Sequence, residues 1–206
     1  MSYVIVGLPA SGKSTVGARL AHRLGQTHLD TDALVERRAG KIIREIFADD
    51  GEAAFRELEE AAVREALSTE GAVVSLGGGA VVTPGVRQMV ASHTVVWLDV
   101  SVRTLTRRAG MNQLRPLLLG DARRQLEILA EARRPLYAEV ATWRIDSDRM
   151  TPSQVVDAIM AAGAGENVDA DSGKPRSLSP RPAAPAPTGG AGAGEGGTIS
   201  RVEESA

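Results

Sequence analysis

One nonapeptide near the N-terminus constrains this chain more than any other feature. Residues 7–15 read GLPASGKST and match the pattern G-x-x-x-x-G-K-[ST] at every defined position. In such a loop the glycines let successive backbone N–H groups point at phosphate oxygens, and the following helix adds the positive end of its dipole. The match follows an apolar run, Tyr3–Val6, that suits a buried parallel strand, and it opens a helical pattern over 14–24. The sequence therefore predicts a P-loop nucleotide-binding fold.

Each residue type in this loop has a defined task in binding ATP. Lys13 is placed to reach the β- and γ-phosphates, and the Ser14 hydroxyl is placed to ligate Mg²⁺. The phosphate oxygens would lie against the backbone of the whole turn, so the expected ATP contacts are Ala10, Ser11, Gly12, Lys13, Ser14 and Thr15. The structural alternative is a glycine-rich strand–helix turn that binds no ligand.

Short apolar runs alternate with helical patterns as far as residue 162. Further strands are expected at 27–29, 72–76, 94–98 and 143–146, and further helices at 33–39, 42–47, 52–67, 84–91, 102–109, 123–138 and 152–162. Strands that alternate with helices predict a parallel sheet covered on both faces. The expected fold class is therefore α/β.

The last 44 residues differ in composition from the rest of the chain. Residues 163–206 contain four large apolar residues, no aromatic residue, five of the ten prolines and nine of the 22 glycines. Such a segment buries too little apolar surface to offset the entropy of ordering it. We therefore predict a single domain over 1–162, followed by a disordered tail over 163–206.

Charge and cysteine content exclude several classes of function. The chain has 24 Lys and Arg against 26 Asp and Glu, and a net charge of −2 gives no electrostatic reason to expect nucleic acid or a membrane as partner. Without cysteine there is no disulfide and no thiolate chemistry. No apolar run reaches the roughly 18 residues of a membrane span, and the N-terminus lacks a signal-peptide pattern. We expect a cytoplasmic protein that is monomeric.

The third predicted strand lacks the carboxylate that many P-loop ATPases carry there. Residues 73–77 read VVSLG, without an acidic side chain. The nearest substitutes are Asp30 and Asp32 at the end of the second strand, because ligands of an open α/β sheet bind beyond the carboxyl ends of its strands. The alternative for either aspartate is that it only caps the next helix.

An ordered set of six segments resembles the shikimate kinase family. They are the phosphate-binding loop, DTD at 30–32, FRELE at 55–59, GGG at 77–79, RPLL at 115–118 and RRPLY at 133–137. The resemblance runs from about residue 3 to residue 160. It implies the nucleoside-monophosphate-kinase-like fold, with five parallel strands in the order 2-3-1-4-5 and a mobile lid. It also implies transfer of the ATP γ-phosphoryl group to the 3-hydroxyl of shikimate, on the route to chorismate and the aromatic amino acids.

The resemblance implies roles for residues on the acceptor side. Asp32 matches the aspartate that orients the acceptor hydroxyl and takes its proton, and Asp30 matches the residue that supports Mg²⁺. Arg56 and Arg133 match the two arginines that grip the substrate carboxylate. Gly78 offers a backbone N–H that a side chain would shield.

The resemblance places three more arginines around the nucleotide. Arg115 matches the lid arginine that closes over the phosphates, and the preceding segment 110–114, without clear periodicity, suits a lid. Arg108 and Arg149 lie where the family packs the adenine. On the acceptor side, Glu59 is expected to pair with Arg56 and keep it oriented.

Other interpretations of the same residues stay open. The eight arginines between 103 and 134 face only three acidic residues, and a solvated helix face accounts for several of them. A nucleic-acid surface is a weaker alternative, because no aromatic residues interleave with them. For the whole chain, the alternatives are another small-metabolite kinase of this fold, such as a gluconate kinase, and a nucleotide-binding regulatory module without catalytic activity.

Overall fold

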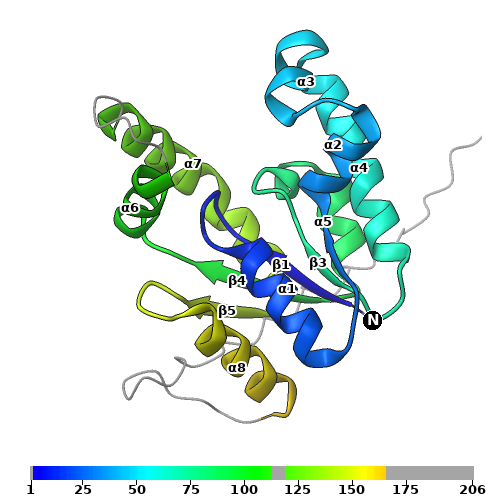
Figure 1. Ribbon diagram of the computed structural model, residues 1–206, viewed down its shortest axis with the longest axis vertical. Coiled ribbons are helices and arrows are strands. Elements are labelled where there is room, and N and C mark those ends of the chain that lie inside the picture. Colours follow the sequence, from blue (N-terminus) through cyan, green and yellow to red (C-terminus); the bar gives the residue numbers. More distant parts are fainter. Residues whose placement is uncertain (1, 113–118, 166–206) are drawn as a thin grey trace, which may run out of the picture.

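Five parallel strands form one sheet in the order β2-β3-β1-β4-β5. They are β1 (Tyr3–Val6), β2 (His28–Asp30), β3 (Val73–Ser75), β4 (Thr94–Asp99) and β5 (Trp143–Asp146). The computed structural model describes residues 2–112 and 119–165 (Figure 1). The predicted α/β class and strand order are confirmed.

The register of the sheet brings three loops to one edge. Ser75 of β3 lies opposite both Asp30 of β2 and Ile5 of β1. Because all strands run the same way, the segments that leave β1, β2 and β3 emerge side by side. These segments are the phosphate-binding loop, the start of the DTD helix and the Gly77–Gly79 loop.

Alternate residues of the strands face two separate apolar layers, as the period of two requires. Ile5, Val96 and Leu98 pack against the helices α1 (Lys13–Leu24) and α8 (Pro152–Gly163). Val4, Val95 and Trp97 belong to the opposite layer. That layer is completed by α4 (Gly51–Ser68), α5 (Pro84–Val90) and α7 (Leu119–Val140).

Two groups of helices rise beyond the strand ends, on either side of the phosphate-binding loop (Figure 1). One group is α2 (Thr31–Ala39) and α3 (Ile43–Asp49), which pack on α4. The other is α6 (Val102–Asn112), which packs on α7. The short helix η1 (Ala80–Val82), which we did not predict, follows the Gly77–Gly79 loop. The site therefore lies between two helical walls.

Several element boundaries differ from the predicted ones. Helix α2 begins at Thr31, two residues early, because the Asp30 side chain caps it. Helix α6 continues to Asn112, so the first three residues of the segment expected to form a lid are helical, and α7 begins at Leu119. The remainder of that segment and Arg115 lie outside the described residues. In the part of the chain that the structure describes, no helix combines the length and apolarity needed to cross a membrane.

Candidate active site

The loop between β1 and α1 has the curled backbone that phosphate binding requires. Gly7, Ala10 and Gly12 all have positive φ, at 151°, 62° and 96°. A methyl group on Gly7 would lie 2.7 Å from the Leu98 carbonyl oxygen, so no side chain fits there. Ala10 holds a left-handed conformation that costs an L-residue about 1–2 kcal/mol. Backbone strain is thus concentrated in the loop, as is common at functional sites.

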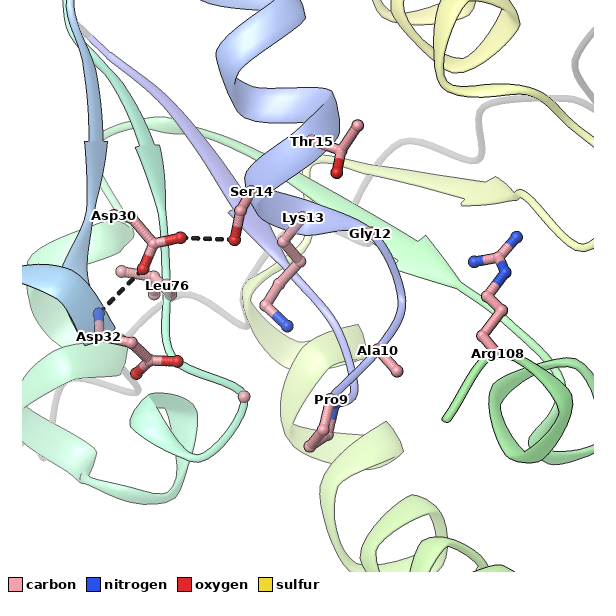
Figure 2. Close-up of a pocket in the computed structure, with 11 residues that line it drawn as sticks. Pro9, Ala10, Gly12, Lys13, Ser14, Thr15, Asp30, Asp32, Leu76 and Arg108 are labelled. Carbon is pink, nitrogen blue, oxygen red and sulfur yellow. Dashed lines mark hydrogen bonds between the residues drawn. The ribbon is translucent and has the colours of Figure 1, made fainter. Parts of the chain in front are cut away.

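Lys13 lies inside this loop, where Figure 2 shows its amine between the two aspartates and the turn. The side chain is only 9% exposed, and Nζ donates to the Leu8 carbonyl oxygen at 3.0 Å. Burial lowers the pKa of Lys13 to about 8, although the charges of Asp32 and Asp30 oppose that shift. A buried cation whose one hydrogen-bond partner among the described residues is a carbonyl oxygen is poised to bind an anion.

The three loops line a common cavity of about 550 Å³. It brings together most of the residues predicted from sequence for the phosphates and the reacting groups: Ala10, Gly12, Lys13, Ser14, Thr15, Asp30, Asp32, Gly78 and Arg108. Figure 2 shows the two aspartates on one side of Lys13 and Arg108 on the other.

Asp30 caps helix α2 and also contacts Ser14 of the phosphate-binding loop. Its Oδ1 accepts from the Asp32 N–H at 3.0 Å and the Ala33 N–H at 3.5 Å, which caps α2. Its Oδ2 accepts from the Ser14 hydroxyl at 2.5 Å. The pair of oxygens from Ser14 and Asp30 suits a hard cation such as Mg²⁺, which keeps several waters and uses few protein ligands. The described residues contain no cluster of three or more His, Asp or Glu side chains that could hold a metal.

Asp32 lies where α2 faces the Gly77–Gly79 loop. Its pKa is raised, first by burial and then by the charges of Asp30 and Glu36, while Lys13 opposes the shift. A methyl group on Gly77 would collide with Asp32 Oδ1, so the glycine lets the carboxylate approach the loop. A carboxylate with a raised pKa is a better proton acceptor than an ordinary aspartate.

Arg56 is held in place by two carboxylates of its own helix. Its Nη1 donates to Glu59 at 2.6 Å and its Nη2 donates to Glu52 at 3.1 Å. Glu59 is buried beneath it, and desolvation raises the pKa of Glu59 against the opposing effect of Arg56. The predicted Arg56–Glu59 pair is therefore confirmed.

Arg133 reaches the same place from α7. Its Nη1 donates to the Gly78 carbonyl oxygen at 3.1 Å. A methyl group on Gly79 would lie 2.9 Å from Arg56 Nη1 and 3.6 Å from Arg133 Nη2. The two guanidinium groups therefore converge on the glycine loop from opposite helices. Two converging guanidiniums form a site for a carboxylate.

Arg108 and Arg149, the two arginines predicted to contact the adenine, line different cavities. Arg108 donates to the Ser11 carbonyl oxygen at 3.2 Å and lines a second cavity of about 230 Å³, whose other walls include Met150, Pro152 and Val155. Arg149 is not brought to either cavity: it lines a separate one of about 420 Å³. Arg108 thus contacts the phosphate-binding loop, whereas Arg149 lines a different cavity and its predicted role at the adenine stays a prediction.

Three polar residues support the site and were not predicted from the sequence. Thr31 and Tyr137, both fully buried, contact the glycine loop through their hydroxyls. Ser75 donates to the Lys13 carbonyl oxygen at 3.1 Å, and His28 Nε2 lies 3.0 Å from the same hydroxyl. For Ser75 the available signal was the one polar side chain in the apolar strand VVSLG. For Thr31 and Tyr137 it was their place within the motifs DTD and RRPLY.

Comparison with known proteins agrees with this geometry. The family model described as shikimate kinase matches residues 9–163. A shikimate kinase of Mycobacterium avium is 52% identical over 159 residues, which is 77% of this chain and 90% of that protein.

Solved structures of shikimate kinases are also similar to this chain. The chain is similar to shikimate kinase from Acinetobacter baumannii in complex with shikimate, with a TM-score of 0.74 and 32% identity over 80% of this chain and 93% of that one. A gluconokinase from Sinorhizobium meliloti has a TM-score of 0.54 at 22% identity, covering 80% of this chain and 91% of that one. The second similarity is one of fold alone.

Proposed function

Because the chain belongs to the shikimate kinase family, we propose that the residues around its phosphate-binding loop transfer the ATP γ-phosphoryl group to the 3-hydroxyl of shikimate. The reaction belongs to the route to chorismate and the aromatic amino acids. The observation that supports this assignment of residues is the convergence of Arg56 and Arg133 on the Gly77–Gly79 loop, because Gly78 of that loop lines the same cavity as Lys13. A carboxylate held there would leave the ring hydroxyls of the acceptor near Asp32.

An ADP-release assay with shikimate and a panel of other hydroxy acids tests this function. We expect turnover with shikimate and little with gluconate, the acceptor of the alternative kinase. Turnover no faster than background ATP hydrolysis would contradict the proposal. Binding of ATP without its consumption would instead favour the regulatory module.

The nucleotide would bind along the loop with its base beside Arg108. The backbone N–H groups of 10–15 and the Lys13 amine would hold the phosphates. The cavity walled by Met150, Pro152 and Val155 offers an apolar surface for the adenine, with Arg108 stacked against it. Arg115 and Arg149 remain proposals from the family pattern, as a lid residue over the phosphates and a second adenine contact.

The transfer itself needs one proton acceptor and several positive charges. Asp32 would take the proton of the acceptor hydroxyl as that oxygen attacks the γ-phosphorus. The bond from the γ-phosphorus to the bridging oxygen breaks, and ADP leaves with the electron pair. Lys13 would stabilise the charge on the phosphoryl oxygens during the step, since phosphoryl transfer depends chiefly on positioning and electrostatics.

Ser14 and Asp30 are the residues that would hold Mg²⁺. Their oxygens form a short hydrogen-bonded pair at the mouth of the loop, which the ion would replace with its own coordination. When bound, the ion neutralises phosphate charge.

Removing the Arg133 guanidinium is expected to weaken acceptor binding selectively. The Arg133→Ala change should raise the KM for shikimate about 10–100-fold, because charge-assisted contacts to a carboxylate are lost. The KM for ATP should change less than threefold, since Arg133 lies on the acceptor side. Steady-state kinetics with each substrate varied in turn measures both. Arg123→Ala, an exposed change on the same helix, is the matched control; an effect on ATP rather than shikimate would show that the assignment is wrong.

The lowered pKa of Lys13 predicts proton-linked nucleotide binding. The free protein loses the Lys13 proton above pH about 8, whereas phosphates would retain it, so binding takes up a proton at higher pH. The Kd for MgADP should be flat below pH 8 and rise toward tenfold per pH unit above it. Calorimetry between pH 7 and 9.5, in buffers of different ionisation enthalpy, measures Kd and proton uptake together. A Kd that stays constant to pH 9.5 would contradict this linkage.

We also propose that one copy of residues 1–165 is the active unit, acting as a monomer in the cytoplasm, where ATP is available. All proposed ligands of both substrates come from one chain, so no second copy is needed to complete the site. A chain ending after Gly165 should keep the kcat and Tm of the full-length protein within error. A lower Tm or a tenfold loss of kcat would assign the following segment a role in the fold or the site.

A further inference from the structure

The acceptor loop Gly77–Gly79 poses a physical problem. Three consecutive glycines form the least restrained backbone that a chain can make. Phosphoryl transfer needs its groups held to within about 0.5 Å of the productive geometry. Contacts from outside the loop must therefore supply the restraint.

Hydrogen bonds from α2, α7 and η1 restrain the Gly77–Gly79 loop. The Gly77 N–H donates to Thr31 Oγ1 at 2.8 Å. The Gly78 carbonyl oxygen accepts from the Tyr137 hydroxyl at 2.6 Å and from Arg133 at 3.1 Å. The Gly77 and Gly79 carbonyl oxygens accept from the backbone of η1. Among residues 2–112 and 119–165 the Gly78 N–H has no acceptor, although Gly78 lines the cavity.

The two partners that contact the loop through a hydroxyl are fully buried. Thr31 and Tyr137 have no exposed surface. Thr31 immediately precedes Asp32 in α2, so the same helical turn carries the proton acceptor and the loop contact. The Tyr137 ring packs against Trp97, with centroids 6.0 Å apart. Burial raises the pKa of Tyr137 to about 12, which keeps its hydroxyl protonated as a donor.

We propose that Thr31 and Tyr137 are positioning residues that hold the Gly77–Gly79 loop from opposite sides and thereby aim the Gly78 N–H at the acceptor. The inference rests on the proposed function and deepens it. A third contact closes the arrangement: a methyl group on Gly78 would lie 3.0 Å from Pro9 Cδ, so the loop also abuts the phosphate-binding loop. The acceptor loop is thus tied to the proton acceptor, to α7 and to the donor side.

Tyr137 and Arg133 share one hydrogen-bond acceptor, the Gly78 carbonyl oxygen. Without substrate, both donate to the Gly78 carbonyl oxygen. When Arg133 turns to a substrate carboxylate, Tyr137 still satisfies that carbonyl. Without the hydroxyl, recruiting Arg133 would leave the partly buried Gly78 carbonyl oxygen without either of these two donors, and this penalty would fall on acceptor binding. The Tyr137 hydroxyl therefore makes Arg133 available to the substrate.

The test uses two substitutions that remove a hydrogen bond and preserve shape. Tyr137→Phe should raise the KM for shikimate about tenfold, and Thr31→Val should lower kcat/KM for shikimate about 10–100-fold, the range expected for a misplaced reacting group. The Kd for MgADP should stay within twofold in both. Thr31→Ser should restore kcat/KM to within threefold of wild type. Tyr3→Phe, which removes the other tyrosine hydroxyl far from the loop, should change nothing.

Each other outcome overturns the proposal. It fails if Tyr137→Phe alters the KM for shikimate less than threefold, or if the nucleotide Kd weakens as much as the acceptor KM. It fails for Thr31 if Thr31→Ser is as impaired as Thr31→Val. Melting temperatures identify a variant that does not fold. If Thr31→Val does not fold, Tyr137→Phe, which keeps the buried ring, tests the proposal. A wild-type protein inactive on shikimate refutes the proposed function, whereas an active wild type with unaffected variants refutes only the positioning roles.

Discussion

Replacing Asp32 with asparagine should lower kcat for shikimate phosphorylation by about 10²–10⁴-fold, the usual contribution of a proton-transfer group. Asparagine keeps the shape of the side chain and loses its ability to accept the hydroxyl proton. The raised pKa of Asp32, caused first by burial, makes this carboxylate a better proton acceptor than an ordinary aspartate, and its side chain lines the cavity. Single-turnover kinetics at saturating ATP and shikimate measures the chemical step directly.

The fold and the nucleotide site should survive the Asp32→Asn change. The cap of α2 comes from Asp30, so the helix keeps its N-terminal hydrogen bonds. The Kd for MgADP should remain within a few-fold of wild type. Asp49→Asn, an exposed change on α3, is the matched control. A kcat within tenfold of wild type would remove Asp32 from the role of proton acceptor.

Replacing Lys13 with methionine should separate function from stability. The change is expected to lower kcat by about 10²–10³-fold, because a charge aimed at the transferring phosphoryl group is lost. In the absence of nucleotide, Tm should stay the same or rise at pH 7. The reason is that burial lowers the pKa of Lys13 to about 8, so holding the ammonium inside the free protein opposes folding.

Thermal unfolding with and without MgADP measures both effects of Lys13→Met. Ligand should raise the Tm of the wild type and raise that of the variant much less, by the mass-action link between binding and stability. Lys41→Met is the control, because Lys41 is an exposed partner of Asp49 and Asp50 outside the site. A variant that loses several degrees of Tm without nucleotide would show that Lys13 is chiefly structural.

Local patterns predicted the elements that depend on neighbouring residues. The phosphate-binding loop, the strand before it and the helix after it all form as expected, because glycine conformation, apolar runs and helical spacing act over a few residues. Helix ends were less predictable. Helix α2 begins at Thr31 because a side chain one residue earlier caps it, and α6 continues to Asn112 while packed on α7. The strand order came from the family resemblance, since periodicity does not state which strands are neighbours.

The sequence by itself determined the chemistry: a P-loop with its lysine and serine, two aspartates after the second strand, and arginines in the family motifs. The tertiary structure alone decided how these groups are held. Thr31 reaches Gly77 across 46 positions and Tyr137 reaches Gly78 across 59, while Arg149 lines a different cavity from Arg108. Residue types and short motifs can be identified from the sequence, because they involve only neighbouring residues. Contacts at such separations exist only once strand order, register and helix packing have brought distant segments together.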